Sequence, residues 1–367
     1  MAFGATRIAR QMLGRAIAYS EYGNPKQVLR CIQYPVQHCS PEELTVRFLA
    51  SPINPSDINQ IEGVYPSRPS MTTDLTPNTP SAVAGNEGVV EVIDVGSSLR
   101  DRWEPGQWAV MSTTNLGTWR THLTTKPENL IRVDQYAFHN VQEAASLTVN
   151  PCTAFMLLHS AVKLQPGDWF MQTGANSVVG MNILQLARHF GYNSINIIRA
   201  RPDAESLKER LRQLGATYVI TDEELMQRSE MKKLVPKWTE NNPPKLGIDC
   251  VSGRTATEMS KYLANSATIS TYGGMSRQPL GIPVSLLIFK DLRFHGFWLT
   301  KWKDEQPSKF RDLVIQMQEY YRRDVLHSPD VDLVDVDANA EPADFLKPFT
   351  DSIGAHGKKV MLFHYDN

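Results

Sequence analysis

Cysteine is scarce in this chain of 367 residues. It has four cysteines, and no two of them form a C-x-x-C pair: Cys31, Cys39, Cys152 and Cys250. A zinc lobe needs paired ligands at close spacing, and a disulfide framework needs a denser and more regular set. The sequence therefore indicates neither, and it favours a reducing compartment.

Long apolar runs and an excess of one charge sign are also lacking. No apolar run approaches the roughly 18 residues that a bilayer crossing needs, so we expect no integral membrane segment. A formal net charge of −1 gives no support to nucleic-acid binding as a main function. With 41% hydrophobic and 21% charged residues, the chain has an ordinary composition and room for two domains.

Acidic residues are missing from the beginning of the chain, where the first acid is Glu21. The same segment carries arginines at three positions: Arg7, Arg10 and Arg15. Ile8, Met12 and Leu13 could form one apolar face of a helix. Such a composition is typical of the remnant of a mitochondrial transit peptide, and an unstructured beginning of no function is the alternative.

A strand, a turn, a helix and a second strand are predicted over residues 168–201. Trp169–Thr173 is short and apolar, as a buried parallel strand is. Residues 178–190 are apolar on more than one face, which favours a helix packed on a sheet. Gly191 ends this helix, and residues 194–198 form the next strand. A unit of about 30 residues is the size of a parallel βαβ crossover.

The turn of this unit is where the pyrophosphate of a dinucleotide could bind, on backbone amides at the helix N-terminus. In place of G-x-G-x-x-G, residues 175–180 read A-N-S-V-V-G. Only Gly180 is in frame, where it allows close contact of helix and strand. Ser177 takes the position at which glycine usually approaches phosphate, and its hydroxyl can donate. An ordinary tight turn is the alternative.

Two arginines follow the second strand. About 20 residues past the turn, a site for NAD usually offers an acid to the ribose 2′-hydroxyl. This chain has Arg199 and Arg201 there. Guanidinium groups match the geometry of a phosphate, so the pair predicts a 2′-phosphate and NADPH as the cofactor. A pair of solvated surface arginines is the alternative.

Strands and helices then alternate, which predicts a doubly wound sheet of six strands. The four further strands are expected at 218–221, 246–251, 267–272 and 292–298, and a helix at 308–323. Residues 16–135 are predicted as short strands of a β-rich domain, a partly open barrel, with a strand pair over 83–95. The tail is expected to return to that domain with a final strand at 360–363.

This organisation resembles the medium-chain dehydrogenase/reductase superfamily. The resemblance implies an α/β protein with a β-rich GroES-like catalytic domain (1–145), a doubly wound Rossmann NADPH-binding domain (146–320) and a C-terminal return to the catalytic domain (321–367). Zinc-using members place a cysteine and a Gly-His-Glu in the first domain, where this chain reads Asn54-Pro55-Ser56-Asp57 and Gly85-Asn86-Glu87. Histidines are not paired with cysteines at ligand spacing, so no metal site is expected.

Within the superfamily the chain is similar to the mitochondrial trans-2-enoyl thioester reductases. Matching phrases occur in order at 54–57, 63–66, 149–151, 176–177, 199–201, 272–275 and 297–299. The family's proton donor, the tyrosine of Gly-x-Tyr-Pro, corresponds to Tyr65. Its cofactor contacts correspond to Asn150, Asn176, Ser177, Val178, Val179, Arg199, Ala200, Arg201, Tyr272, Gly273, Gly274, Met275, Phe297, Trp298, Leu299 and Lys358. Ala200 departs from the aspartate that the family usually has between the arginines.

The resemblance implies reduction of the carbon–carbon double bond of an enoyl thioester, carried by acyl carrier protein or coenzyme A, in fatty acid synthesis. It also implies a homodimer in the mitochondrial matrix. Tyr65 could instead pack on the nicotinamide, and Asn150 could orient the nicotinamide amide or cap a helix. An NADPH:quinone reductase and a non-catalytic NADPH-binding sensor or scaffold are the competing functions.

Overall fold

The computed structural model describes residues 12–328 and 331–366. They form two compact units. The first unit comprises residues up to Thr148 together with Gln306–Glu319 and the chain from Asp330, and the second comprises Val149–Glu305 and Tyr320–Pro329. Within the described residues, no helix combines the length and the apolar character that a membrane crossing requires. The proposed transit remnant lies mostly at 1–11, outside the described residues.

The second unit is built on one parallel sheet of six strands. Its strands are β9 (Trp169–Thr173), β10 (Asn193–Ile198), β11 (Tyr218–Thr221), β12 (Leu246–Asp249), β13 (Thr268–Thr271) and β14 (Arg293–Gly296). They lie in the order β11-β10-β9-β12-β13-β14, and every neighbouring pair is parallel. The order reverses between β9 and β12, as in a dinucleotide-binding sheet, so the predicted fold is confirmed.

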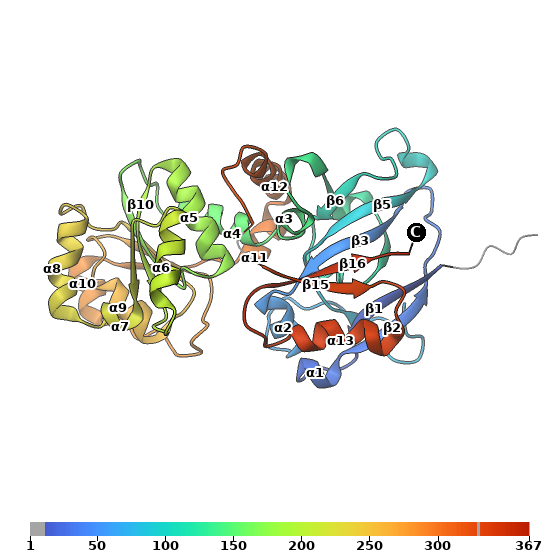
Figure 1. The fold of residues 1–367 in the computed structure, drawn as a ribbon, viewed down its shortest axis with the longest axis horizontal. Coiled ribbons are helices and arrows are strands. Elements are labelled where there is room, and N and C mark those ends of the chain that lie inside the picture. Colours follow the sequence, from blue (N-terminus) through green and yellow to red (C-terminus); the bar gives the residue numbers. More distant parts are fainter. Residues whose placement is uncertain (1–11, 329–330, 367) are drawn as a thin grey trace, which may run out of the picture. The chain divides into compact units, whose positions relative to one another are not determined.

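Helices cover this sheet with two separate apolar cores. One core joins α5 (Val178–Phe190) and α6 (Ala204–Gln213) to the ends of β10 and β11. The other contains side chains of α8 (Arg228–Trp238), α9 (Gly253–Ser260) and α10 (Val284–Lys290), with alternate residues of the central strands. Because side chains of a strand alternate between faces, the two cores lie on opposite faces of the sheet. The remaining helices of this unit are α4 (Asn150–His159), α7 (Asp222–Leu225) and α11 (Leu299–Glu305). Figure 1 labels β10 of this sheet and the helices α5, α6, α8 and α9 of the same unit.

The first unit is β-rich and has two sheets. A sheet of three strands has the order β2-β1-β4, and a sheet of seven strands has the order β15-β16-β3-β5-β6-β8, with β7 also pairing with β3. The strands are β1 (Leu13–Tyr19), β2 (Arg30–Pro35), β3 (Leu44–Pro52), β4 (Ala82–Val83), β5 (Val89–Val95), β6 (Trp108–Met111), β7 (His122–Thr125), β8 (Leu130–Val133), β15 (Asp332–Asp337) and β16 (Lys359–His364). The predicted strand pair over 83–95 is wrong, because β4 pairs with β1 while β5 pairs with β3 and β6.

The end of the chain completes this unit. Strand β16 lies antiparallel to β3, and α13 (Pro342–Ser352) packs on β1 and β2, as Figure 1 shows in red. The other helices of the unit are α1 (Pro25–Val28), α2 (Pro55–Ile61), α3 (Val141–Ala145) and most of α12 (Pro307–Arg322). Helix α12 joins the first unit because Arg311 donates to the carbonyl of Leu130 and Gln318 accepts from the amide of Asp134. The predicted range 146–320 had placed it with the nucleotide-binding sheet.

The beginning of the described chain differs from the expectation of a helical face. Leu13 opens strand β1, and Arg15 is buried within it. The Arg15 guanidinium donates to the carbonyls of Ala338 at 2.8 Å and Asn339 at 2.7 Å. Arg15 therefore ties the first strand to the turn after β15, and it is part of the folded unit.

Candidate active site

The turn between β9 and α5 has the features of a phosphate-binding turn. Gly174 has φ +61°, and Ser177 is the N-cap of α5, where its hydroxyl oxygen accepts from the Gly180 amide at 3.0 Å. A Cβ on Gly180 would lie 2.6 Å from the carbonyl oxygen of Ala175, so only glycine permits this approach of helix and strand. The Ser177 hydroxyl oxygen accepts inside the turn, and a hydroxyl group can donate as well as accept.

The loop after β13 reaches the same turn. The backbone amide of Tyr272 donates to the backbone carbonyl of Asp249, and the amide of Met275 donates to the carbonyl of Cys250. These two bonds hold the loop against the end of β12. The Tyr272 hydroxyl is buried beside the Cys250 thiol and Ser177; burial and Cys250 raise its pKa well above the ordinary value. Within the part of the chain that the structure describes, this hydroxyl forms no hydrogen bond of normal geometry. A buried donor with none is suited to an acceptor that a ligand brings.

A buried pair that the sequence analysis missed holds these strand ends together. The Thr173 hydroxyl, at the end of β9, donates to the Asp249 carboxylate at 2.7 Å, at the end of β12. The same Asp249 oxygen accepts the amides of Val251 and Ser252, both at 3.1 Å. An acid directly after the apolar run of β12 was the signal that could have indicated it. The pair fixes the point at which the strand order reverses.

Asn150 is the first residue of α4 and is buried, with 6% of its surface exposed. The N-cap of this helix is Val149, so Asn150 is not the capping residue. Its side-chain amide nitrogen is buried and has no hydrogen-bond partner among residues 12–328 and 331–366. An unpaired buried amide costs about 1–3 kcal/mol, which a ligand acceptor can recover. This observation favours ligand binding over the capping alternative.

A cavity of about 560 Å³ lies at the end of β10. Its lining includes two of the predicted residues, Ala200 and Arg201, and it is completed by Ala204, Thr221, Glu223, Glu224 and Gln227. Arg199 is exposed and does not line the cavity. The two arginines are thus not equivalent, because Arg201 lines the cavity and Arg199 does not.

The acids in this cavity are partly neutralised by a buried lysine. Lys208 of α6 donates to Glu205 at 2.8 Å and to Glu224 at 2.9 Å. Burial raises the pKa of Glu224, but the bonds from Lys208 and Thr221 outweigh it and leave the pKa lowered. Glu224 therefore faces the cavity as a paired carboxylate, which weakens its repulsion of a phosphate. Lys208 is a second residue that the sequence analysis missed.

The remaining predicted residues of the second unit also lie at the carboxyl ends of its strands. Asn176, Val178 and Val179 are half-buried at the start of α5. Phe297 is buried after β14, with its amide donating to Thr271 at 2.9 Å, and Leu299 opens α11. The others follow β13 and β14: Gly273, Gly274 and Trp298. These predicted cofactor residues thus lie at the carboxyl ends of the strands, where open α/β sheets bind ligands.

Tyr65 and Lys358 belong to the first unit. Tyr65 is half-buried in the turn after α2, where its amide donates to the carbonyl of Asn59 at 3.1 Å. Lys358 precedes β16 and donates to the side-chain oxygen of Asn54. Burial lowers the pKa of Lys358, while Glu87 and Asp57 oppose that shift. Lys358 is therefore held among buried acids of its own unit.

The places at which zinc-using relatives hold their metal contain hydrogen-bonded pairs. Asn54 donates to the Glu87 carboxylate at 3.0 Å, and Asn86 donates to the Asp57 carboxylate at 2.7 Å. Burial raises the pKa of Asp57, against bonds from Asn86 and the Asn54 amide. Neither amide is a usual zinc ligand, so this donor set does not suit that metal.

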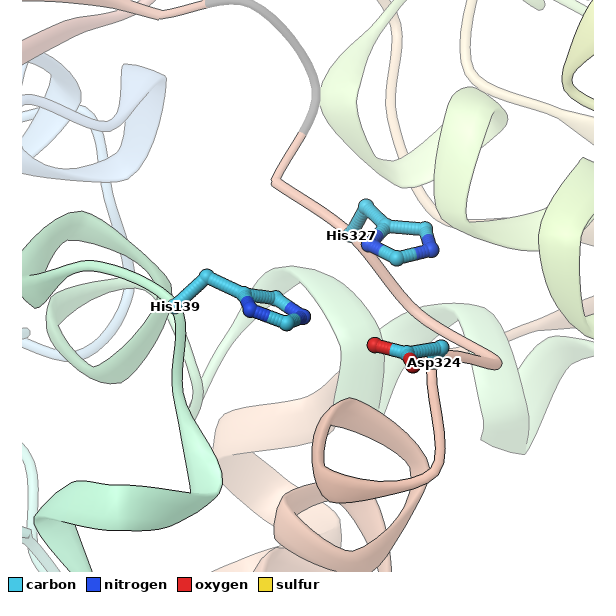
Figure 2. A group of neighbouring side chains, drawn as sticks. All are labelled: His139, Asp324 and His327. Carbon is cyan, nitrogen blue, oxygen red and sulfur yellow. The ribbon is translucent and has the colours of Figure 1, made fainter.

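Exposed side chains with metal-ligating atoms occur elsewhere in the described residues. Figure 2 shows His139 of the first unit, and Asp324 and His327 of the second. The second unit contributes two of these groups, and a structural zinc site takes four ligands. We assign no metal to these side chains.

Comparison with known proteins shows the family to which the chain belongs. Residues 178–318 match the family model described as "Zinc-binding dehydrogenase". The mitochondrial enoyl-[acyl-carrier-protein] reductase of Schizosaccharomyces pombe is 56% identical over 363 residues, covering 99% of this chain and 97% of that protein.

Solved structures agree with that relation. The complex of Etr1p with NADP and crotonyl-CoA superposes with a TM-score of 0.91 at 35% identity, covering 96% of this chain and all of that one. The Etr1p/Etr2p heterodimer of the mitochondrial 2-enoyl thioester reductase from Candida tropicalis gives the same values. The chain belongs to the family of mitochondrial enoyl-acyl-carrier-protein reductases.

Proposed function

We propose that this chain is an NADPH-dependent trans-2-enoyl thioester reductase of fatty acid synthesis in the mitochondrial matrix. The observation that carries the proposal is its relation, over nearly the full length of both chains, to a mitochondrial enoyl-acyl-carrier-protein reductase. The residues in the second unit fit a dinucleotide, because the α5 N-terminus, the unpaired Tyr272 hydroxyl and the unpaired Asn150 amide all lie at strand or helix ends that offer donors.

Different residues of the second unit bind different parts of NADPH. Backbone amides of the first turn of α5, with the Ser177 hydroxyl, bind the pyrophosphate. Arg201 binds the 2′-phosphate in the cavity after β10, which selects NADPH over NADH. The Asn150 amide donates to the carboxamide of the nicotinamide and orients its ring. Bound NADPH supplies the hydride for the β-carbon of the enoyl thioester.

Tyr65 supplies the proton that the α-carbon requires. As hydride arrives at the β-carbon, negative charge builds up on the thioester oxygen, and the α-carbon then takes a proton from the Tyr65 hydroxyl. A tyrosine hydroxyl is one of the side-chain groups that act as general acids in enzymes. The reaction requires no metal to stabilise the negative charge on the thioester oxygen. The hydrogen bonds of Asn54 and Asn86 to buried carboxylates support a zinc-independent reaction.

One assay separates this function from its competitors. NADPH oxidation should be measured with trans-2-enoyl thioesters of increasing chain length on acyl carrier protein and on coenzyme A, and with quinones in parallel. We expect turnover of enoyl thioesters and little turnover of quinones. Comparable or faster quinone reduction would favour the quinone reductase. Tight NADPH binding with no turnover of any thioester would favour a sensor or scaffold.

A homodimer through the second unit completes the proposal. Helix α10 has four apolar side chains that are 43–79% exposed: Val284 and the consecutive Leu287, Ile288 and Phe289. Strand β14 is at the edge of the sheet, and one of its sides has no strand partner among the described residues. An open edge beside an apolar helix is suited to a second copy related by a two-fold axis.

Sedimentation tests the homodimer. We expect the wild-type chain to be a dimer and the double variant Ile288→Glu, Phe289→Glu to be a folded monomer. Leu333→Glu is the matched control, because Leu333 is an exposed apolar residue (46%) of the first unit. A monomeric wild type, or a double variant that stays dimeric, would contradict this arrangement.

A further inference from the structure

Gln60 lies at the centre of a buried hydrogen-bond network in the first unit. It is on α2 and is 4% exposed. Its side-chain nitrogen donates to the carbonyl of Ser67 and to the side-chain oxygen of Asn115, both at 2.8 Å. Its side-chain oxygen accepts from Asn86 at 2.6 Å. Both N–H donors and one acceptor site of the oxygen are thus used.

These contacts fix the loop that carries Tyr65. The loop leaves α2 at Gly63, where φ is +76°, and its far end at Ser67 is held by Gln60. Asn115 adds a second bond to Ser67, from its side-chain nitrogen to the serine hydroxyl at 3.1 Å. Residues 63–67 are therefore anchored at one end by the helix and at the other by two amide side chains, the buried Gln60 and the half-buried Asn115.

The near end of the loop is also tied to α2. The amides of Val64 and Tyr65 both donate to the carbonyl of Asn59, at 2.9 and 3.1 Å. The Arg68 guanidinium donates to the carbonyl of Tyr65 at 2.9 Å and lies over the ring of Tyr22, 5.0 Å from its centroid. The backbone on both sides of Tyr65 is thus held. Arg68 is exposed, whereas the Gln60 side chain that bonds to Ser67 is buried.

The surroundings of Gln60 explain why an amide is needed there. Asn86, which donates to Gln60, also donates to the buried Asp57 carboxylate. The backbone amide of Asn115 donates to the side-chain oxygen of Asn86 at 2.9 Å. A glutamine both accepts from Asn86 and donates to the loop, whereas a carboxylate or a methyl group cannot do both.

We propose that Gln60 is a positioning residue that sets the place of the Tyr65 hydroxyl through its bond to Ser67. The proposal rests on the proposed function, in which Tyr65 is the proton donor. Displacement of a reacting group by about 1 Å can cost about a hundredfold in rate. Gln60 touches no reacting atom, so its loss should lower kcat and leave cofactor binding unchanged.

A double-mutant cycle tests this proposal. Gln60→Met keeps the size of the side chain and removes its donor, and Tyr65→Phe removes the proton donor alone. We expect Gln60→Met to lower kcat by about 10- to 100-fold while the Kd for NADPH stays within about twofold. In the Tyr65→Phe background the same substitution should change kcat by no more than about twofold, because the group that it positions is already gone.

Two further variants keep the test decisive. Gln318→Met is the matched control: Gln318 is also buried, at 5% exposure, and it accepts from the Asp134 amide on another element of the first unit. It should leave kcat unchanged. Asn115→Gly removes the second tie to Ser67, and glycine tolerates the φ of +66° at this position. It should lower kcat in the same direction as Gln60→Met, and it serves in place of that variant if Gln60→Met does not fold.

The outcomes separate the two claims. If Tyr65→Phe leaves kcat nearly unchanged, the proton-donor role fails, and the role of Gln60 fails with it. If Tyr65→Phe is strongly impaired but Gln60→Met is neutral, or costs the same factor in both backgrounds, Gln60 does not act through Tyr65. A loss in Gln318→Met as large as in Gln60→Met would likewise assign the effect to general stability.

Discussion

Replacing Arg201 by alanine should change the cofactor preference of the enzyme. Arg201 lines the cavity at the end of β10, with 23% of its side chain exposed. A hydrogen bond to a charged group contributes about 1.5–3 kcal/mol. Loss of one such bond to the 2′-phosphate should therefore weaken NADPH binding by about 10- to 150-fold. NADH lacks that phosphate, so its affinity should change little.

The ratio of the two affinities removes the side effects of the substitution. Arg201 also forms an ion pair with the exposed Asp203, at 3.5 Å. Such a surface pair contributes about 0–1 kcal/mol, and its loss affects both cofactors equally. Arg199→Ala should have a smaller effect than Arg201→Ala, because Arg199 does not line the cavity. Arg212→Ala, on the exposed side of α6, is the control.

Equilibrium titration of NADPH and NADH against each variant measures the effect. The reasoning would be refuted if Arg201→Ala left the NADPH/NADH ratio of dissociation constants unchanged. It would also be refuted if Arg199→Ala alone abolished the preference. In the second case the phosphate would lie outside the cavity, against the exposed arginine.

Three further predictions follow from single observations. Chelation should leave the reduction rate intact, and elemental analysis should find no stoichiometric zinc; a loss that zinc alone restores would contradict this. Asn150→Ala should lower NADPH affinity by about fivefold, through one lost hydrogen bond, with little change in thermal stability because the amide is unpaired. Burial, and then Arg47, lower the pKa of His122 to about 4, so the neutral form is favoured in the fold. The free energy of unfolding should thus fall, on the order of 3 kcal/mol in all, as pH drops from 6.5 to about 4, and His122→Gln should flatten that fall; an unchanged slope would assign it to other groups.

The parallel sheet could be predicted from the sequence because its strands are short apolar runs separated by helices. The turn before α5 was indicated by Gly180, whose place in the motif has a steric cause. Strand partners were harder, since they depend on contacts far apart in the chain. The segment 83–95 has the composition of strands throughout, but the sequence does not show that β4 pairs with β1 and β5 with β3.

The polar contacts of the site were mostly beyond sequence analysis. Thr173 and Asp249 are 76 residues apart, and Gln60 and Asn115 are 55 apart, so no local pattern joins them. The arginine pair was found from the sequence. The sequence could not show that, of these two arginines, Arg201 lines the cavity and Arg199 does not. Tyr65, Lys358 and the other residues taken from the family resemblance remain assignments, of which the variants above test Tyr65, Asn150, Arg199 and Arg201.

The rate of NADPH oxidation by wild type and by Tyr65→Phe, with a short trans-2-enoyl thioester, tests the central claim most directly. The substitution keeps the aromatic ring, which packs in the loop, and removes the hydroxyl group that donates the proton. General acid catalysis contributes about 100- to 10,000-fold, so kcat should fall at least about a hundredfold while the Kd for NADPH stays the same. A Phe variant within about threefold of wild type in kcat would contradict the account.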